Sequence, residues 1–427
     1  MTFIHEKAPL ARRKCVECMQ AGQENGVETA NIVDDAPTER PPLYAEPVVP
    51  KKENNAMPTV EGRAVLLNEA GTPATLEDIT IDAPGPGEVL VGIVASGVCH
   101  TDLTIKNLKG NGMPFPIVLG HEGAGYVEQV GEGVTHLKVG DPVVLAYRAP
   151  CEQCPACRRG DPRHCYAALK PKQRIRRKRD GALCSQVLRC GTFSTHTVVH
   201  SKAAIKMPAA MPLDKACLIA CGVITGVGAT MNTTKVWPGA RVAVIGCGGV
   251  GLSVIQGARL AHAGMIIAVD VNPVKLDWAK EYGATHFVNA KDGDPVAAVR
   301  ALTEDGWDGG VEFAYEATGI PACIEQAVKM LSYNGTATTI GFPAAADAVT
   351  LNLGDMSTGV YWNKTTLCVC HAGDTLPSHD FPLLAQLYLD GHLKLDGMVS
   401  NVITLDEVED AFHAMETGNI IRSVIKI

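Results

Sequence analysis

The sequence predicts an α/β protein that combines a small β-rich domain with a doubly wound parallel sheet. Three observations carry this prediction. The chain has 427 residues, too many for one hydrophobic core. Short apolar runs broken by glycine and proline fill residues 60–150, and from about residue 222 to 370 strand-like and helix-like runs alternate.

The N-terminal part divides into an extension and the β-rich domain. Residues 1–57 carry scattered prolines and charges without periodicity, which predicts disorder. We expect Cys15 and Cys18 in this extension to be free thiols, because a structural zinc needs four ligands. Further along, residues 89–94 and 142–145 read as strands, and a Pro- and Gly-rich turn occupies residues 83–87.

The central part has the pattern of a parallel sheet. Residues 241–245 and 265–270 are buried-strand runs, and residues 250–261 between them are helical in pattern. A strand, a helix and a strand in this order predict parallel strands with a crossover helix. Asn272 and Pro273 then suit the N-cap and first turn of the next helix.

Bulk properties exclude several classes of protein. The net charge of −8 argues against nucleic-acid binding, which needs a basic face. No apolar run reaches the roughly 18 residues expected of a membrane span, and the N-terminus lacks the apolar region of a secretory signal. The 15 cysteines therefore suggest reduced thiols and metal ligands in a cytoplasmic protein.

A glycine-rich turn after the first strand predicts a dinucleotide site. Gly246, Gly248 and Gly251 have the fingerprint spacing, with Gly249 at the start of the helix, where the helix N-terminus faces phosphate. Asp270 ends the next strand, where a carboxylate binds the adenosine ribose and repels a 2′-phosphate. The pattern therefore favours NAD over NADP.

Four closely spaced cysteines predict a structural zinc site. Cys151, Cys154, Cys157 and Cys165 can close a tetrahedral shell of thiolates, which leaves no position for a substrate. An iron–sulfur cluster or free thiols are the alternatives for this lobe.

The chain from about residue 57 to the end resembles the zinc-containing medium-chain alcohol dehydrogenases. The resemblance rests on the segments 97–102, 120–125, 220–222 and 225–226, together with the cysteine lobe and the glycine turn. Asp270 with Lys275, and the segment 421–423, complete it. Long-chain members and bacterial thiol-dependent formaldehyde dehydrogenases look most similar.

The resemblance implies an architecture and a set of roles. It implies a GroES-like catalytic domain at residues 58–222 and 371–427, and a Rossmann NAD domain at residues 223–370. It implies two zinc ions per chain, a catalytic ion bound by Cys99, His121 and Cys221, and a structural ion in the cysteine lobe. By the same resemblance, Thr101 binds the substrate hydroxyl and starts the proton relay, Asp102 orients His121, and Glu122 lies behind the zinc. His100 and Arg422 contact the pyrophosphate, Thr225 contacts the nicotinamide side, and Lys275 contacts the adenosine ribose.

One position departs from the family pattern. Many members carry a histidine that ends the proton relay three residues after the position of Thr101, and here that residue is Thr104. A hydroxyl passes a proton but is not a base near neutral pH.

A basic stretch follows the cysteine lobe. Residues 170–179 hold seven cations. We interpret the stretch as a solvated, mobile surface loop, with recruitment of an anionic substrate as the alternative.

The activity implied is reversible hydride transfer between NAD and a primary or aromatic alcohol or its aldehyde. The first alternative is a thiol-dependent formaldehyde dehydrogenase. A second is an enzyme that retains its nicotinamide, and a third is a zinc-free, non-enzymatic binding protein on the same scaffold. The family also implies a small-molecule substrate and a homodimer or homotetramer.

Overall fold

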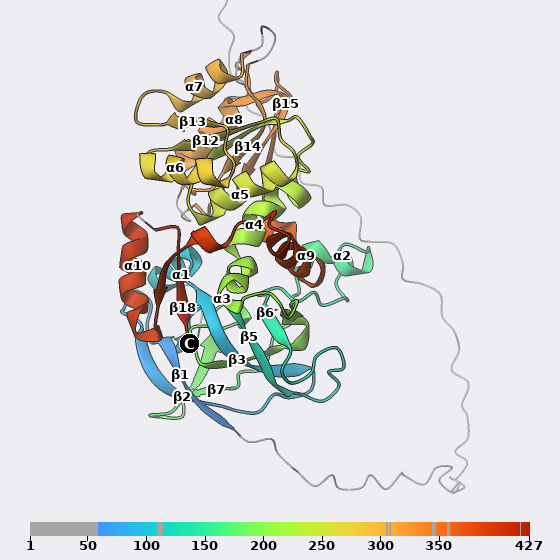
Figure 1. Ribbon diagram of the computed structural model, residues 1–427, viewed down its shortest axis with the longest axis vertical. Coiled ribbons are helices and arrows are strands. Elements are labelled where there is room, and N and C mark those ends of the chain that lie inside the picture. The colour runs from blue at the N-terminus through green and yellow to red at the C-terminus, as the bar shows by residue number, and fades with distance from the viewer. Residues whose placement is uncertain are drawn as a thin grey trace, which may run out of the picture. The chain divides into compact units, whose positions relative to one another are not determined.

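The computed structural model describes residues 59–108, 114–304, 306, 309–343, 347–356, 359–418 and 420–427. The expectations for residues 1–57, including the free thiols at Cys15 and Cys18, lie outside the described residues. Two β-structures and one parallel sheet make up the strand framework (Figure 1).

The first β-structure is a closed barrel of five short strands. In barrel order the strands are β1 (Val60–Leu67), β2 (Thr75–Ile81), β7 (Ile175–Arg177), β8 (Leu183–Gln186) and β4 (Ile117–Val118). Aliphatic side chains from β1, β2, β4 and β7 fill it, and Ala64, Leu66, Ile79, Ile81 and Ile175 are fully buried.

The second β-structure is a mixed sheet in which the two ends of the chain meet. Its strands are β10 (Ala204–Lys206), β6 (Pro142–Leu145), β5 (Glu122–Val130), β3 (Glu88–Gly97), β18 (Arg422–Lys426) and β17 (Val399–Ile403), with β9 (His196–His200) paired to β3. β18 pairs antiparallel with the end of β3, where Val424 lies opposite Gly97. The last strand of the chain therefore lies beside the loop that carries Cys99.

The third sheet is parallel throughout. Its order is β13 (His286–Asn289), β12 (Met265–Asp270), β11 (Arg241–Ile245), β14 (Val311–Glu316), β15 (Leu331–Thr339) and β16 (Thr366–Val369). The strands expected at residues 142–145, 241–245 and 265–270 are confirmed, and the one at 89–94 forms the middle of β3.

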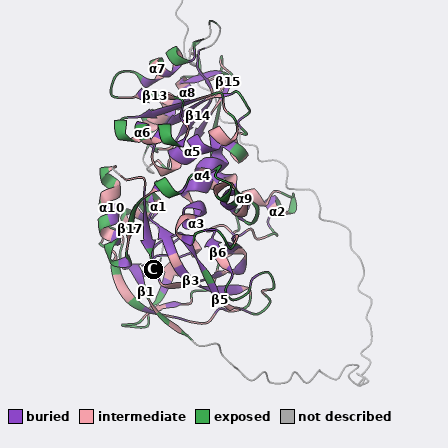
Figure 2. Cartoon of the chain, viewed as in Figure 1, coloured by how far each residue is buried: buried purple, intermediate pink, exposed green. Residues whose placement is uncertain are grey.

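Helices cover both faces of the parallel sheet. Val242 and Val244 of β11 pack in one core cluster with α5 (Gly249–Leu260) and α6 (Pro273–Tyr282). Ala243 and Ile245 point to the opposite face and pack with α7 (Pro295–Leu302) and α8 (Pro321–Lys329). The sheet is thus doubly wound, as predicted, and its strands are mostly buried (Figure 2).

The remaining helices join the strand framework or lie over it. They are α1 (His100–Asn107), α2 (Pro155–Arg158), α3 (Leu213–Ala216), α4 (Gly222–Gly228), α9 (Pro377–Leu389) and α10 (Val408–Thr417). α4 packs closely on α5, so it links the dinucleotide half to the β-rich half. The domain boundaries at residues 222/223 and 370/371 stay predictions.

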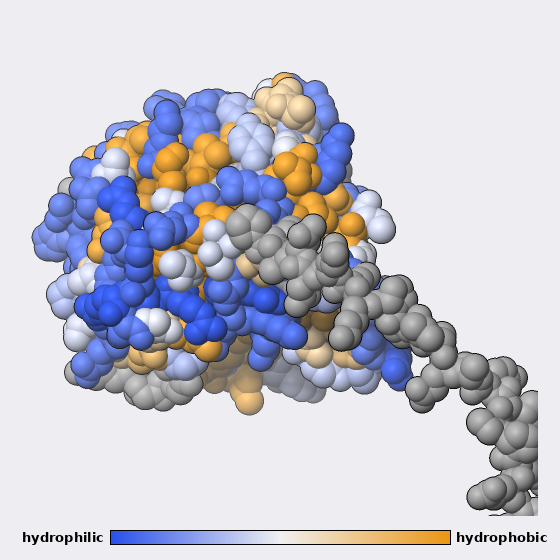
Figure 3. All heavy atoms as spheres, turned by 90° about the horizontal axis from the view of Figure 1, so that it is seen from below, coloured by the Kyte–Doolittle hydropathy of each residue, from blue (hydrophilic) through white to orange (hydrophobic). Residues whose placement is uncertain are grey.

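The basic stretch differs from the expected mobile loop. Its centre is strand β7, and ion pairs neutralise most of its cations. The pairs are Arg174–Glu88, Arg176–Asp82, Arg177–Asp180, Lys178–Glu61 and Arg179–Glu77. Little free positive charge is left to recruit an anion. The face of the molecule seen from below shows hydrophilic residues with apolar ones between them (Figure 3).

Among the described residues, no single helix has the length and apolar composition to cross a membrane, and one bent pair, Leu213–Ala220 with Gly222–Thr233, has them only when its two helices are taken together.

Candidate active site

Three loops from distant parts of the sequence bring a set of metal-ligating side chains together. Cys99 follows β3 and caps α1, His121 directly precedes β5, and Cys221 caps α4. One ligand atom of each, together with one of Glu122, lies within 4.8 Å of the others. The three residues predicted to bind the catalytic zinc are therefore neighbours in space.

The orientation of His121 suits metal binding. Its Nδ1 lies 3.2 Å from Asp102 Oδ1, and the same oxygen accepts a hydrogen bond from the backbone N–H of Gly120 at 2.9 Å. His121 Nε2 is buried and has no hydrogen-bond partner among the described residues. A carboxylate on Nδ1 fixes the tautomer in which Nε2 is free to bind a metal.

The Cys99 thiol also suits a cation. A hydrogen bond from Cys221 and the nearby His121 hold the pKa of the Cys99 thiol well below its usual range, although burial opposes them. A thiolate is the form that binds zinc. Two cysteines and one histidine match a catalytic zinc with an open fourth position.

Glu122 and Arg422 form a buried ion pair next to these ligands. Burial raises the pKa of Glu122 to about 7, and the Arg422 guanidinium opposes that shift. Arg422 begins β18, and its side chain also touches the glycine turn, since a Cβ at Gly249 would lie 2.8 Å from Arg422 Cδ. The side chain of Arg422 thus contacts both Glu122, beside the metal ligands, and the glycine turn.

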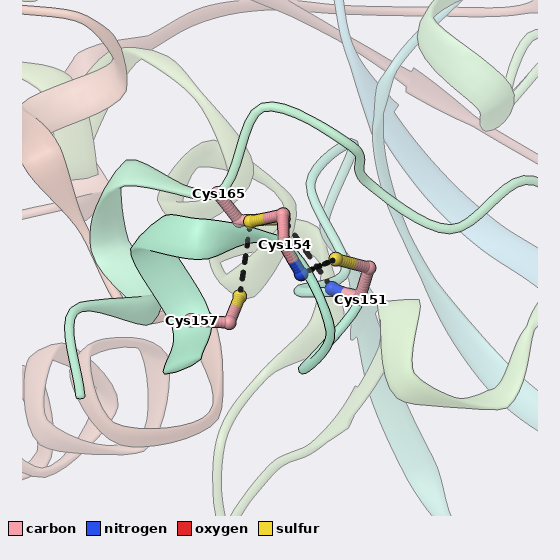
Figure 4. Close-up of side chains that lie close together, drawn as sticks. All are labelled: Cys151, Cys154, Cys157 and Cys165. Atoms are coloured by element: carbon pink, nitrogen blue, oxygen red, sulfur yellow. Dashed lines mark hydrogen bonds between the residues drawn. The ribbon is translucent and has the colours of Figure 1, made fainter. Parts of the chain in front are cut away.

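The four cysteines of the lobe meet around α2 (Figure 4). The Cys154 sulfur lies 3.6 Å from that of Cys157 and 3.9 Å from that of Cys165. A tetrahedral zinc with bonds of about 2.3 Å places its sulfurs about 3.8 Å apart. The lobe therefore has the dimensions of a zinc–tetrathiolate site.

Backbone N–H groups support these sulfurs. Cys154 N and Gln153 N donate to Cys151 Sγ at 3.2 and 3.4 Å, and Cys151 N donates to Cys165 Sγ at 3.3 Å. Such donors favour thiolates.

The glycine turn has the geometry that a pyrophosphate needs. Gly246 has a φ of +90°, which favours glycine. A Cβ at Gly251 would lie 1.8 Å from the carbonyl oxygen of Gly246, so the close contact between turn and helix requires glycine. A Cβ at Gly248 would meet nothing within 4 Å, so this position faces open space at the N-terminus of α5.

Asp270 is held at the end of β12 beside this turn. Its Oδ2 accepts from the backbone N–H of Cys247 at 2.8 Å, and its Oδ1 accepts from that of Asn272 at 2.9 Å. Asn272 caps α6 and Pro273 occupies its first turn, as predicted. The carboxylate stands where an adenosine ribose would meet it.

Two cations, Arg422 and Lys275, and the neutral His100 lie near one another between the two sites. Burial, Arg422 and Lys275 lower the pKa of His100, while the Cys99 thiol acts in the opposite direction. His100, Lys275 and Arg422 are therefore close enough to interact electrostatically, as a pyrophosphate site requires. Thr225 is half-buried on α4, where its N–H donates to the carbonyl oxygen of Cys221 at 2.9 Å.

The threonines of the expected relay differ in exposure. Thr101 is half-buried in the first turn of α1, next to Asp102. Thr104 lies one turn later and is exposed.

Three residues near the helix that Cys221 caps were not identified from the sequence. Burial raises the pKa of Tyr147, and the charge of Cys221 acts in the same direction. Arg148 Nη1 lies 3.3 Å from Nδ1 of His371, and the preceding residue, Cys370, has its Sγ 3.9 Å from the carbonyl oxygen of Thr225 on α4. Arg148 follows Tyr147 in the chain, and Arg189 Nη1 donates to the Tyr147 carbonyl oxygen at 3.3 Å. No motif includes these residues, so no sequence signal pointed to them.

Comparisons with known proteins agree with this geometry. Residues 85–209 match the family model "Alcohol dehydrogenase GroES-like domain", which confirms the expected class of the β-rich part, and residues 249–389 match "Zinc-binding dehydrogenase". Alcohol dehydrogenase class-3 of Cereibacter sphaeroides is 38% identical over 377 residues, 85% of this chain and 99% of the relative. S-(hydroxymethyl)glutathione dehydrogenase of Paracoccus denitrificans is 37% identical over 376 residues, with 85% and 99% covered.

A solved structure is similar over the same range. The crystal structure of benzyl alcohol dehydrogenase from Acinetobacter calcoaceticus matches with a TM-score of 0.78 and 32% identity. The match covers 86% of this chain and 99% of that one.

Proposed function

The chain belongs to the zinc-dependent alcohol dehydrogenase family and is an oxidoreductase that acts on a small molecule; we propose that its substrate is an adduct of formaldehyde with a low-molecular-weight thiol. The names of the curated relatives support this alternative better than the general alcohol dehydrogenase that the sequence alone placed first. The observation that carries the reaction type is the contact of Arg422 with both Glu122 and the glycine turn.

In this proposal Cys99, His121 and Cys221 hold the catalytic zinc, which supplies a Lewis acid that favours loss of the hydroxyl proton. NAD supplies the hydride acceptor, so the alcohol carbon loses a hydride and its oxygen loses a proton. Asp102 keeps His121 in the ligating tautomer. Thr101 receives the hydroxyl proton at its Oγ1 and passes it outward, with exposed Thr104 as a later member of the relay.

The dinucleotide is held by the turn and the cations around it. The backbone at Gly246, Gly248 and Gly249 approaches the pyrophosphate, and Gly251 lets the helix pack closely on the turn. Arg422 neutralises the pyrophosphate, and His100 contacts it as a neutral imidazole. Thr225 contacts the nicotinamide side. Asp270 and Lys275 hold the adenosine ribose, so we propose NAD rather than NADP. Replacement of Asp270 by Ser should lower kcat/KM for NAD and raise it for NADP, and an unchanged ratio would contradict this assignment.

The second candidate is a general dehydrogenase for primary or aromatic alcohols, which the similarity to benzyl alcohol dehydrogenase favours. Turnover of formaldehyde only when a thiol is present supports the first candidate. Turnover of free benzyl alcohol with no thiol, and no gain from formaldehyde plus thiol, supports the second.

We also propose assembly into a homodimer or homotetramer through the open edge of the parallel sheet. β16 is the edge strand, and large apolar side chains near it are exposed: Phe342 (83%), Tyr361 (73%) and Val369 (71%). Exposed apolar surface of this kind marks interaction sites. A Val369→Lys variant that elutes with the mass of the wild type in light scattering would contradict this interface.

A cytoplasmic location is part of the same proposal. The thirteen cysteines in the described part of the chain are all free, which suits a reducing compartment.

A further inference from the structure

Two arginines flank Tyr147 at the candidate active site. Arg148 follows Tyr147 in the chain and donates from Nη2 to the Cys165 carbonyl oxygen at 2.8 Å. Its Nη1 lies 3.3 Å from Nδ1 of His371, which follows β16 of the parallel sheet. Arg189 donates from Nη1 to the Tyr147 carbonyl oxygen at 3.3 Å. Cys370, which precedes His371, has its Sγ 3.9 Å from the carbonyl oxygen of Thr225 on α4, the helix that Cys221 caps, so Arg148 lies where the two halves of the chain meet and Arg189 is one residue contact away.

Neither guanidinium is neutralised. Among the described residues, neither Arg148 nor Arg189 forms an ion pair with a carboxylate, although both are half-buried. Several other half-buried or buried arginines have one, as in Arg174–Glu88, Arg241–Glu312 and Arg422–Glu122. A partly desolvated cation without a counter-ion is unfavourable for folding, so a binding role explains it better than a structural one.

The backbone at Arg189 is strained. Leu188 has φ 47° and ψ 31°, and Arg189 has φ 68°, so two consecutive residues with side chains occupy the left-handed region. This conformation is uncommon outside glycine, and it persists at sites where function requires it. The strain fixes the direction in which the arginine side chain leaves the loop.

One edge of the Arg189 guanidinium is free for a ligand. Nη1 is used by Tyr147, and Nε is buried without a hydrogen-bond partner among the described residues. The Nε and Nη2 N–H groups lie on one side of the planar group and match the two oxygens of a carboxylate. A buried donor without a partner calls for an acceptor, and a ligand oxygen at this edge would supply one.

We propose that Arg189, assisted by Arg148, forms a carboxylate-binding subsite that makes the enzyme selective for alcohols or thiol adducts bearing an acid group. The subsite deepens the proposed function, because a carboxylate-bearing thiol is then the preferred carrier of formaldehyde. It also moves the anion site away from the basic stretch at residues 170–179, whose charges are mostly paired.

The test compares 4-(hydroxymethyl)benzoate with benzyl alcohol, which differ only in the carboxylate. The wild type should have the higher kcat/KM for the acid. In Arg189→Gly the ratio of the two kcat/KM values should fall by about 10- to 100-fold, the value of a charge-assisted pair. Arg189→Lys, which keeps the charge but loses the fork, should give an intermediate ratio.

Two controls separate binding from structure. Arg176→Gln on β7 removes the same charge from an ion pair with Asp82 and should leave the ratio unchanged. Glycine adopts a φ of 68° without strain, which offsets the lost hydrogen bond to the Tyr147 carbonyl oxygen, so the unfolding temperature of Arg189→Gly should stay close to that of the wild type. An unchanged ratio in Arg189→Gly, or an equal fall in Arg176→Gln, would overturn the subsite.

The test of the carboxylate subsite does not depend on whether a formaldehyde–thiol adduct is the substrate. If the acid is preferred and Arg189→Gly abolishes the preference while no formaldehyde–thiol adduct is oxidised, the subsite stands and the proposed substrate fails. If an adduct is oxidised but 4-(hydroxymethyl)benzoate has no higher kcat/KM than benzyl alcohol, the proposed substrate stands and the subsite fails.

Discussion

Asp102→Asn is the substitution that most directly tests how the candidate catalytic site holds its metal. Oδ1 of the Asp102 carboxylate accepts from the Gly120 N–H at 2.9 Å and lies 3.2 Å from His121 Nδ1, while Oδ2 lies 3.1 Å from the same nitrogen. A carboxylate accepts at both oxygens, whereas an amide has one acceptor and one donor. The change is nearly isosteric, so packing around this fully buried side chain is preserved.

Either orientation of the new amide weakens the site. If its oxygen takes the place of Oδ1, its NH₂ takes the place of Oδ2, 3.1 Å from His121 Nδ1, and the negative charge that favours a proton on Nδ1 is lost, so the tautomer with the proton on Nε2, which cannot bind a metal, gains. If its NH₂ takes the place of Oδ1, the buried Gly120 N–H and His121 Nδ1 both lose their acceptor, at a cost of about 1–3 kcal/mol for the N–H. We therefore expect affinity for the catalytic zinc to fall by about 10- to 100-fold.

Competition with a chromophoric chelator measures this effect, because the two metal sites release zinc in separate steps. The step assigned to the cysteine lobe should not change. Asp141→Asn is the matched control, since Asp141 is also buried and accepts from a backbone N–H, that of Lys138, at 3.0 Å, but lies outside the ligand set. Wild-type zinc affinity in Asp102→Asn, or equal loss in Asp141→Asn, would refute the reasoning.

Three further predictions concern the cofactor turn, the cysteine lobe and the proton relay. Gly251→Ala should raise the Kd for NADH more than about tenfold in a fluorescence titration and lower the unfolding temperature, because its Cβ meets the Gly246 carbonyl; Gly248→Ala should weaken NADH but leave the unfolding temperature unchanged. Arg163→Met should lower the free energy of unfolding by about 2 kcal/mol in urea, since it removes the guanidinium that pairs with buried Asp380 and leaves this carboxylate with His379 and N–H donors only; exposed Arg158→Met should have no effect. Thr104→His should shift the pH profile of alcohol oxidation to lower pH by supplying a base, and an unchanged profile would remove Thr104 from the relay.

Features encoded within a few residues were predictable from the sequence. The glycine turn and the cysteine lobe each lie within one short segment, so spacing alone constrains their geometry. The strand that follows Pro142 and the helix that follows Gly248 were predictable for the same reason, because their apolar period is local.

Features that depend on distant pairing were not predictable from the residues alone. Cys99, His121 and Cys221 meet only because β3, β5 and α4 converge, and a family resemblance was needed to group them. The basic stretch was misread as a mobile loop, because its counter-ions on and near β1, β2 and β3 lie about a hundred positions earlier in the chain. The strain at Arg189 is likewise a property of the folded loop and has no signature in composition.

The most direct test of the central claim is NADH formation by the purified, zinc-analysed protein with formaldehyde, in the presence and absence of a carboxylate-bearing thiol. The account predicts two zinc ions per chain and NADH formation from formaldehyde only when the thiol is present. An equal rate of NADH formation with and without the thiol would contradict this account. A protein that binds one zinc ion or none, and forms no NADH from any alcohol or adduct, would contradict it as well.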